Sequence, residues 1–211
     1  SAGNPKTWTS FLKEKGITVV HVVSSVKFAI KAEASGVDAI VCEGFEAGGH
    51  NGREETTTFT LIPMVKESVT IPVIAAGGIG NGRGMLAAMV LGADGVQIGS
   101  RFAATEESSA HINFKQKIID VKDGDTHLTL KELAPVRLIK NKFYQEIKEL
   151  YKENPTKEEL IGLLGRARAK KGIFEGDLDN GELEIGQIAG IINNISSAKD
   201  ILEEIVTDFE T

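Results

Sequence analysis

The sequence predicts an α/β protein with a parallel sheet, and two features of the first half of the chain lead to that class. Four short apolar runs, several of them rich in β-branched residues, recur along it, and helical patterns lie between them. The runs contain almost no polar residues, as is typical of parallel strands that helices cover on both faces. An alternation of strand and helix is the βαβ pattern, whose crossovers are right-handed.

Each expected element has its own start or stop signal. The first helix is capped by Asn4 with Pro5 at its first position and ends at Gly16, and the second starts at Ser24 or Ser25 and runs through Ala34. Two more helices are expected, over 61–67 and 84–91. The expected strands cover 17–23, 37–42, 71–75 and 95–98.

The second half of the chain reads differently, as a helical appendage over residues 111–211. Amphipathic spacing predicts one helix over 143–151 and a closing helix over 201–209. Between them, Thr156 and Glu159 form a capping-box pattern for a helix that we expect to stop at Gly172. Residues 1–110 are then the α/β part.

Composition excludes several classes of function. The chain has 211 residues and a formal net charge of −6, so nothing offers a basic stripe to nucleic acid. No run of about 18 apolar residues predicts a membrane span. The single cysteine, Cys42, excludes an intrachain disulfide; we expect it to be a core residue, and its scarcity predicts a cytoplasmic protein. No metal-ligand spacing such as H-E-x-x-H or C-x-x-C is present.

Glycine-rich loops follow the third and fourth expected strands. Gly77 and Gly78 come after one, and Gly99 and Ser100 after the other; Gly78 and Gly99 are 21 residues apart (99 − 78), which is one βα unit. Glycine lets backbone N–H groups approach an anion, and the carboxyl ends of adjacent strands lie side by side. This pair predicts the phosphate site typical of strands seven and eight of a (β/α)₈ TIM barrel.

Only four parallel strands are expected, whereas a closed barrel needs eight. Either the other four come from missing sequence or from a partner chain, or the sheet is open. We favour the C-terminal half of a barrel, from a longer protein.

The loop after the second strand carries His50, between Gly48-Gly49 and Gly52. A histidine just past a strand end is a candidate acid or base, because its unperturbed pKa of about 6.5 lets it pass a proton either way near neutral pH. His21 lies inside a strand and is expected to be packed. His111 and His127 are expected to be surface residues.

Three motifs make a resemblance specific. Glu43-Gly-Phe-Glu-Ala-Gly-Gly-His50, Ile71-Pro-Val-Ile-Ala-Ala-Gly-Gly78 and Gly92-Ala-Asp-Gly-Val-Gln-Ile-Gly-Ser-Arg-Phe102 resemble the family of nitronate monooxygenases and FMN-dependent enoyl-acyl-carrier-protein reductases II. The resemblance covers nearly the whole chain but only the C-terminal two-thirds of a family member. It implies that His50 is catalytic and that FMN is bound by Glu43, Gly48, Gly77, Gly78, Gln97, Ile98, Gly99 and Ser100. Ser100 stands where many members have threonine, and either hydroxyl can donate to phosphate.

Within the family, Ser1-Ala-Gly-Asn-Pro5, Glu107-Ser-Ser-Ala-His111 and Gly186-Gln-Ile-Ala-Gly190 look closer to the reductase branch. That branch implies that NAD(P)H reduces FMN and that the flavin reduces an enoyl thioester, free or bound to acyl-carrier protein. The alternative is a nitronate monooxygenase that uses O₂. The resemblance implies either a homodimer or a requirement for the missing N-terminal half of the barrel.

Two rival classes remain for comparison. An enzyme of the inosine monophosphate dehydrogenase type shares the glycine loops but needs a cysteine after the second one, and no cysteine follows Ser100. A half-barrel that folds only with a partner and binds no flavin is the non-catalytic alternative.

Overall fold

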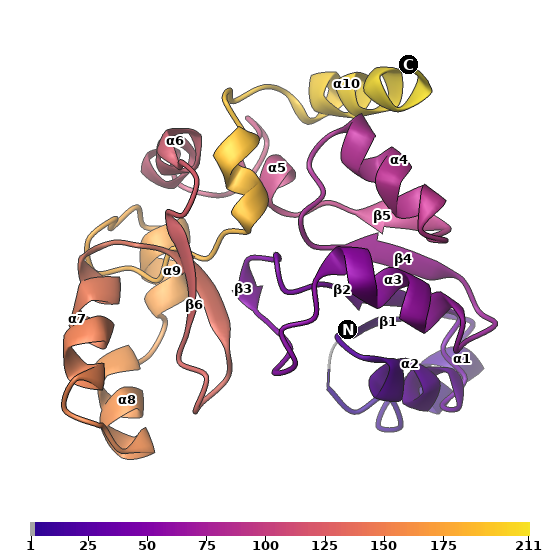
Figure 1. Cartoon of the computed structure of the whole chain (residues 1–211), viewed down its shortest axis with the longest axis horizontal. Helices are drawn as coiled ribbons and strands as arrows, with labels where there is room; N and C mark the ends of the chain where they lie inside the picture. The colour runs from indigo at the N-terminus through magenta and orange to yellow at the C-terminus, as the bar shows by residue number, and fades with distance from the viewer. Residues whose placement is uncertain (1–2) are drawn as a thin grey trace. The chain divides into compact units, whose positions relative to one another are not determined.

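The computed structural model describes residues 3–211, so Ser1 and Ala2 of the first reductase-like segment lie outside it (Figure 1). Two compact units make up the chain. Of the described residues, unit 1 contains 3–46, 54–98 and 205–211, and unit 2 contains 47–53 and 99–204. No helix in the described part is long and apolar enough to cross a membrane.

Unit 1 is built on a parallel sheet of four strands. They are β1 (Val20–Val23), β2 (Ala39–Glu43), β4 (Val73–Ala76) and β5 (Gly95–Gln97), and they are hydrogen-bonded in the order β1-β2-β4-β5 (Figure 1). The order follows the chain without the reversal that marks a doubly wound sheet. The predicted α/β class is therefore confirmed, with half of a barrel's parallel strands.

The helices of unit 1 share one core with the sheet. They are α1 (Thr9–Glu14), α2 (Val26–Glu33), α3 (Thr58–Lys66) and α4 (Gly82–Val90). Strand residues Val23, Cys42 and Ala75, one row of the sheet, pack with buried residues of α2, α3 and α4. Strands in sequential order with right-handed crossovers place these helices on one face, which differs from the two covered faces that the apolar strands predict.

Unit 2 contains a second, antiparallel sheet, with strand order β3-β7-β6. Its strands are β3 (Gly49–His50), β6 (Thr126–Thr129) and β7 (Val136–Ile139). The prediction of a purely helical appendage is therefore wrong for residues 126–139. The signal is weak there because both strands are only four residues long and each contains a polar or charged residue.

Unit 2 has two hydrophobic clusters, to which the sheet and several of its helices contribute. The helices are α5 (Ser100–Ala103), α6 (Ile112–Asp120), α7 (Lys142–Tyr151), α8 (Lys157–Leu164), α9 (Arg168–Ile173), the 3₁₀ helix η1 (Gln187–Ile191) and the first part of α10 (Ala198–Glu210). The capping box of Thr156 and Glu159 is confirmed. The helix stops at Gly165, with φ 62°, and not at Gly172, because this positive φ ends the helical turn.

The boundaries between the two units differ from the single boundary after residue 110 that the sequence predicts. Most of unit 2 lies between Gly99 and residue 204. The short segment 47–53, which interrupts unit 1 in the sequence, also belongs to unit 2, and from Ile205 onward the chain belongs to unit 1 again. The loop that carries His50 consequently belongs to unit 2, although it follows a strand of unit 1.

Candidate functional site

In unit 1, three side chains form a row at the carboxyl ends of the strands. Glu43, Ala76 and Gln97 are register partners across β2, β4 and β5. Because side chains alternate along a strand, this row faces away from the core row of Cys42 and Ala75. The carboxyl ends of parallel strands are where α/β folds build their sites. Glu43 and Gln97 of the predicted set therefore share one face and one edge of the sheet.

These two polar side chains differ in environment. Gln97 is exposed, whereas Glu43 is half-buried, and burial raises the pKa of its carboxyl. A carboxyl with a raised pKa keeps its proton to higher pH and can then donate a hydrogen bond. The neighbouring Ile98 is partly buried and packs on the sheet core.

The loop after β4 needs both of its glycines. Gly77 has φ 91° and Gly78 has φ 72°, in the left-handed region that favours glycine. A Cβ on Gly77 would lie 2.7 Å from the carbonyl oxygen of Gly44. Two successive residues of positive φ turn backbone N–H groups sharply at a strand end, where an anion can be bound.

Hydrogen bonds of Thr58 hold this loop; we call this set of contacts the Thr58 tie. The hydroxyl of Thr58, at the first turn of α3, lies 2.8 Å from the carbonyl oxygen of Gly77 and 3.2 Å from that of Ala76. The Glu46 carboxylate accepts from the Thr58 backbone N–H at 2.9 Å and lies 3.0 Å from the Thr58 hydroxyl. Thr58 is buried, so the first turn of α3 fixes the end of β4.

In unit 2, the loop that carries His50 lies directly on residues 184–186. A Cβ on Gly48 would stand 2.4 Å from the backbone carbon of Ile185, and one on Gly49 would stand 2.8 Å from a carboxylate oxygen of Glu184. The backbone of Ile185 thus requires glycine at position 48, and a φ of 74° favours it at position 49. The pairing of β3 with β7 then fixes the backbone of His50 opposite Val136.

Two side chains accompany His50. The amide nitrogen of Asn51 donates to the carbonyl oxygens of Ala47 and Gly49, at 2.9 and 3.0 Å, which holds the loop in shape. Burial raises the pKa of the Glu184 carboxyl, and the charge of nearby His50 opposes that rise. His50 itself is exposed, so an exposed imidazole stands within electrostatic reach of a half-buried carboxyl.

Ser100 is connected to the same segment. Its hydroxyl oxygen accepts from the backbone N–H of Gly186 at 2.9 Å, which leaves the hydroxyl proton to be donated elsewhere. Gly99, which precedes it, has a negative φ of −98°, and a Cβ there would meet nothing within 4 Å. Neither backbone conformation nor crowding within the chain requires glycine at this position.

The predicted residues thus form two groups, one in each unit. Glu43, Gly77, Gly78, Gln97 and Ile98 belong to the sheet edge of unit 1. Gly48, His50, Gly99 and Ser100 belong to unit 2, where residues 184–186 connect the His50 loop to Ser100.

Sequence reasoning did not single out Thr58, Asn51 or Glu184. Nothing in their spacing distinguishes them, since Thr58 and Glu184 act on loops 19 and 135 residues away (77 − 58 and 184 − 49). Glu46 lies inside the first motif, so its position could have suggested a role.

Other expectations about single residues have clear outcomes. Cys42 is fully buried, and burial raises the pKa of its thiol to about 12, as fits a core residue. His21 is also buried, as expected for a strand residue. The imidazole of His111 accepts from the Asn113 backbone N–H at the start of α6, so it caps a helix.

Comparison with known proteins places the chain. Residues 1–208 match the family model of nitronate monooxygenase. A probable nitronate monooxygenase of Staphylococcus saprophyticus is 38% identical over 76% of this chain and 49% of its own length. The chain spans about half the length of such curated relatives.

Solved structures agree with this result. FabK from Thermotoga maritima is 43% identical, with a TM-score of 0.90 over 99% of this chain and 66% of that protein. A nitroalkane oxidase from Streptomyces ansochromogenes is 28% identical, with a TM-score of 0.80 over 100% of this chain and 62% of that protein. Because the family model extends over almost every residue, the chain belongs to the nitronate monooxygenase family.

Proposed function

We propose that the chain is part of an FMN-dependent oxidoreductase. Gly99 is the observation that carries the proposal. It follows β5 at the carboxyl edge, and nothing in the chain's own packing explains why it is glycine. A phosphate group that approaches the backbone closely explains it.

The residues present suit such a cofactor. In unit 1 the turn at Gly77-Gly78 offers backbone N–H groups, and in unit 2 the Ser100 hydroxyl has a proton to donate. When bound, FMN supplies the hydride or electron chemistry that side chains lack. The role of His50 is to hold or move a proton at the substrate, and the charge of Glu184 orients the His50 imidazole.

Two matched glycine variants test the phosphate role. Gly95 and Gly99 lie at opposite ends of β5, and at both positions a Cβ would meet nothing within 4 Å. We expect Gly95→Ala and Gly99→Ala each to change the free energy of unfolding by less than about 1 kcal/mol. Only Gly99→Ala should weaken FMN binding, by about tenfold or more, in a titration of flavin fluorescence. Equal FMN affinity in both variants would contradict the assignment.

For the substrate, we propose an enoyl thioester reduced at the expense of NAD(P)H. The identity with FabK, 43% over nearly the whole chain, exceeds the 38–39% with curated probable nitronate monooxygenases over three-quarters of it. The second candidate is oxidation of a nitronate with O₂, which the family model and the curated names favour.

Anaerobic flavin reduction separates the two. In the reductase case, NADH or NADPH bleaches the flavin rapidly and a crotonyl thioester restores its colour without oxygen. In the monooxygenase case, the nicotinamides act slowly, and turnover requires a nitronate and O₂. A purified protein that cannot be loaded with FMN supports the third alternative, a half-barrel that needs its missing strands.

A His50→Ala variant with normal turnover would remove the proton role of His50.

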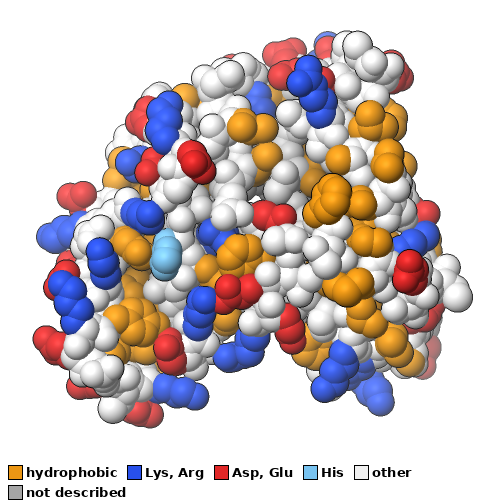
Figure 2. Space-filling model, viewed as in Figure 1, with side chains coloured by type: hydrophobic (Ala, Val, Ile, Leu, Met, Phe, Trp, Pro, Cys, Tyr) orange, Lys and Arg blue, Asp and Glu red, His pale blue; other side chains and the backbone are white. Residues whose placement is uncertain are grey.

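A homodimer is part of the proposal and has one supporting observation. Large apolar side chains are exposed on α3 and α4 of unit 1, where Figure 2 shows hydrophobic atoms over these helices. Phe59 is 70% and Val90 is 79% exposed. Apolar side chains that gather on a surface mark contact sites. Sedimentation of Phe59→Asp and of the unmodified protein compares their oligomeric states and tests the homodimer. The expected cytoplasmic location is tested separately, by fractionation of cells.

A further inference from the structure

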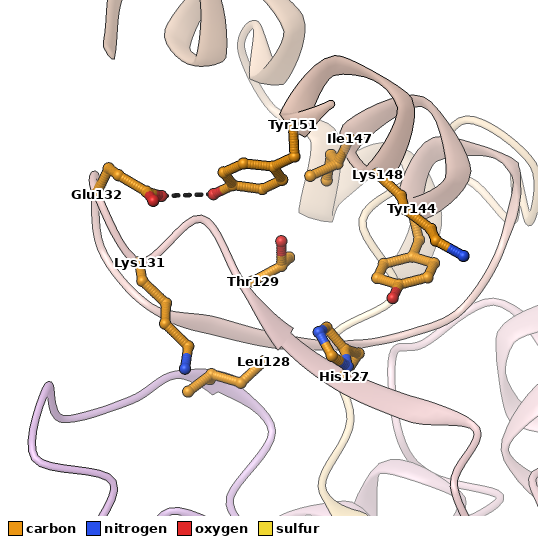
Figure 3. A pocket seen from close by; sticks show the side chains of 9 residues that line it. All are labelled: His127, Leu128, Thr129, Lys131, Glu132, Tyr144, Ile147, Lys148 and Tyr151. Atoms are coloured by element: carbon orange, nitrogen blue, oxygen red, sulfur yellow. Dashed lines mark hydrogen bonds between the residues drawn. The ribbon is translucent and has the colours of Figure 1, made fainter. Parts of the chain in front are cut away.

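A cavity of about 230 Å³ lies in unit 2, between the β6–β7 hairpin and α7 (Figure 3). Its apolar wall comes from Leu128, Ile147 and the rings of Tyr144 and Tyr151. The hydroxyl-bearing Thr129 stands between the two rings in Figure 3, and it is buried. None of the nine lining residues belongs to the predicted flavin set. The cavity is therefore a separate feature of this unit.

Positive charge surrounds the mouth of this cavity. Lys131, Lys148 and His127 line it together with one acid, Glu132. In Figure 2, hydrophobic atoms near α7 and β6 are bordered by Lys or Arg side chains and a histidine. Burial and four nearby cations, among them Lys148 and Arg137, lower the pKa of His127, as expected where the potential is positive.

The one acid is already engaged. The Tyr151 hydroxyl donates to the Glu132 carboxylate, and this bond lowers the pKa of that carboxyl (Figure 3). Lys148, by contrast, forms none of the ion pairs among the described residues. Among the lining residues, two lysines thus outnumber the one carboxylate, which is hydrogen-bonded to Tyr151.

The size of the cavity limits its ligand. About 230 Å³ is below the roughly 300–1,000 Å³ typical of drug-sized ligands, so FMN or a nicotinamide dinucleotide does not fit. Two tyrosine rings and an isoleucine suit a single aromatic ring. We propose that this cavity binds a small aromatic carboxylate, with its ring over Thr129 and against Tyr144 and Tyr151, and its carboxylate toward Lys148 and His127.

The composition of the chain offers a direct readout, because Tyr144 and Tyr151 are its only two tyrosines. Protein labelled with 3-fluorotyrosine has two ¹⁹F signals, both from this cavity, and Tyr151→Phe assigns them. Benzoate, benzamide and benzylamine carry the same ring with charges of −1, 0 and +1. We expect benzoate to shift both signals and to bind about fivefold more tightly than benzamide.

Lys148→Met tests the charge without disturbing the core, because this side chain is exposed. It should weaken benzoate binding about threefold and leave benzamide unchanged. Lys142→Met is the matched control, an exposed lysine of the same helix that does not line the cavity, and it should change neither. Equal binding of benzamide or benzylamine, or no ¹⁹F shift with millimolar benzoate, would overturn the proposal.

Discussion

The tie between Thr58 and the loop after β4 can be cut with one substitution of nearly equal shape. Thr58→Val keeps the branched side chain and removes only the hydroxyl. That hydroxyl lies 2.8 Å from the Gly77 carbonyl oxygen and 3.0 Å from the Glu46 carboxylate, and the side chain is buried. The variant therefore leaves one of these two acceptors, the one that holds the hydroxyl proton, without that partner, while Glu46 keeps the backbone N–H of Thr58.

The expected loss can be worked out from these contacts. A hydroxyl has one proton, so it satisfies one acceptor at a time, and a net hydrogen bond contributes about 0.5–1.5 kcal/mol. An acceptor left without a partner in a buried place adds about 1 kcal/mol more. We expect Thr58→Val to lower the free energy of unfolding by about 2 kcal/mol, which moves the urea midpoint down by about 1 M at a slope of about 2 kcal/mol/M.

The assay is urea unfolding followed by circular dichroism, with amide hydrogen exchange of the peptide over residues 73–82. Exchange there should accelerate, since the Gly77 carbonyl loses its anchor. Thr60→Val is the control, because Thr60 is exposed on the same helix and should change stability by less than about 0.5 kcal/mol. If Thr58→Val is as stable as Thr60→Val, with unchanged exchange, the tie does not hold the loop.

Three further changes test other parts of the chain. Gly48→Ala would place a Cβ 2.4 Å from the backbone of Ile185, so we expect a loss of about 1–3 kcal/mol in urea unfolding. Burial, with the charge of Glu184 adding to it, raises the pKa of Glu182 from 4.5 to about 7 in the folded chain, so the protonated form is favoured there. Stability should fall by about 1–3 kcal/mol as the pH rises from 4.5 through 7, and Glu182→Gln should flatten that profile. Thr156→Ala removes half of the capping box of α8 and should cost about 1 kcal/mol, with lower helicity by circular dichroism.

The strands of unit 1 could be predicted because their pattern is local. Apolar runs place β1, β2, β4 and β5 within a few residues of their observed bounds, and glycines follow the last three of these strands. The hairpin of β6 and β7 could not be predicted in the same way. The polar ends of Thr126–Thr129 and the charge of Arg137 weaken the apolar pattern of β6 and β7. These two strands form because they pair with each other, and their own composition does not predict them.

The site divides along the same line. Spacing predicts a site at the strand ends that carry Gly77-Gly78 and Gly99-Ser100, and the family resemblance implies Glu43 and Gln97. What supports them could not, because Thr58 contacts Gly77 only after β2, α3 and β4 have packed. Glu184 likewise meets the His50 loop only after a chain of more than a hundred residues returns to it.

The glycines of the predicted site illustrate how structure refines a motif. In the sequence, Gly77 and Gly99 both predict a backbone that approaches a phosphate, and the family resemblance adds Gly48 as an FMN contact. In the structure, Gly77 is required by its φ of 91° and Gly48 by the backbone of Ile185, so folding alone explains both. Gly99 has neither constraint. Loss of FMN affinity in a variant of Gly48 or Gly77 would mix damage to the fold with loss of a contact. Only at Gly99 does such a loss measure the ligand.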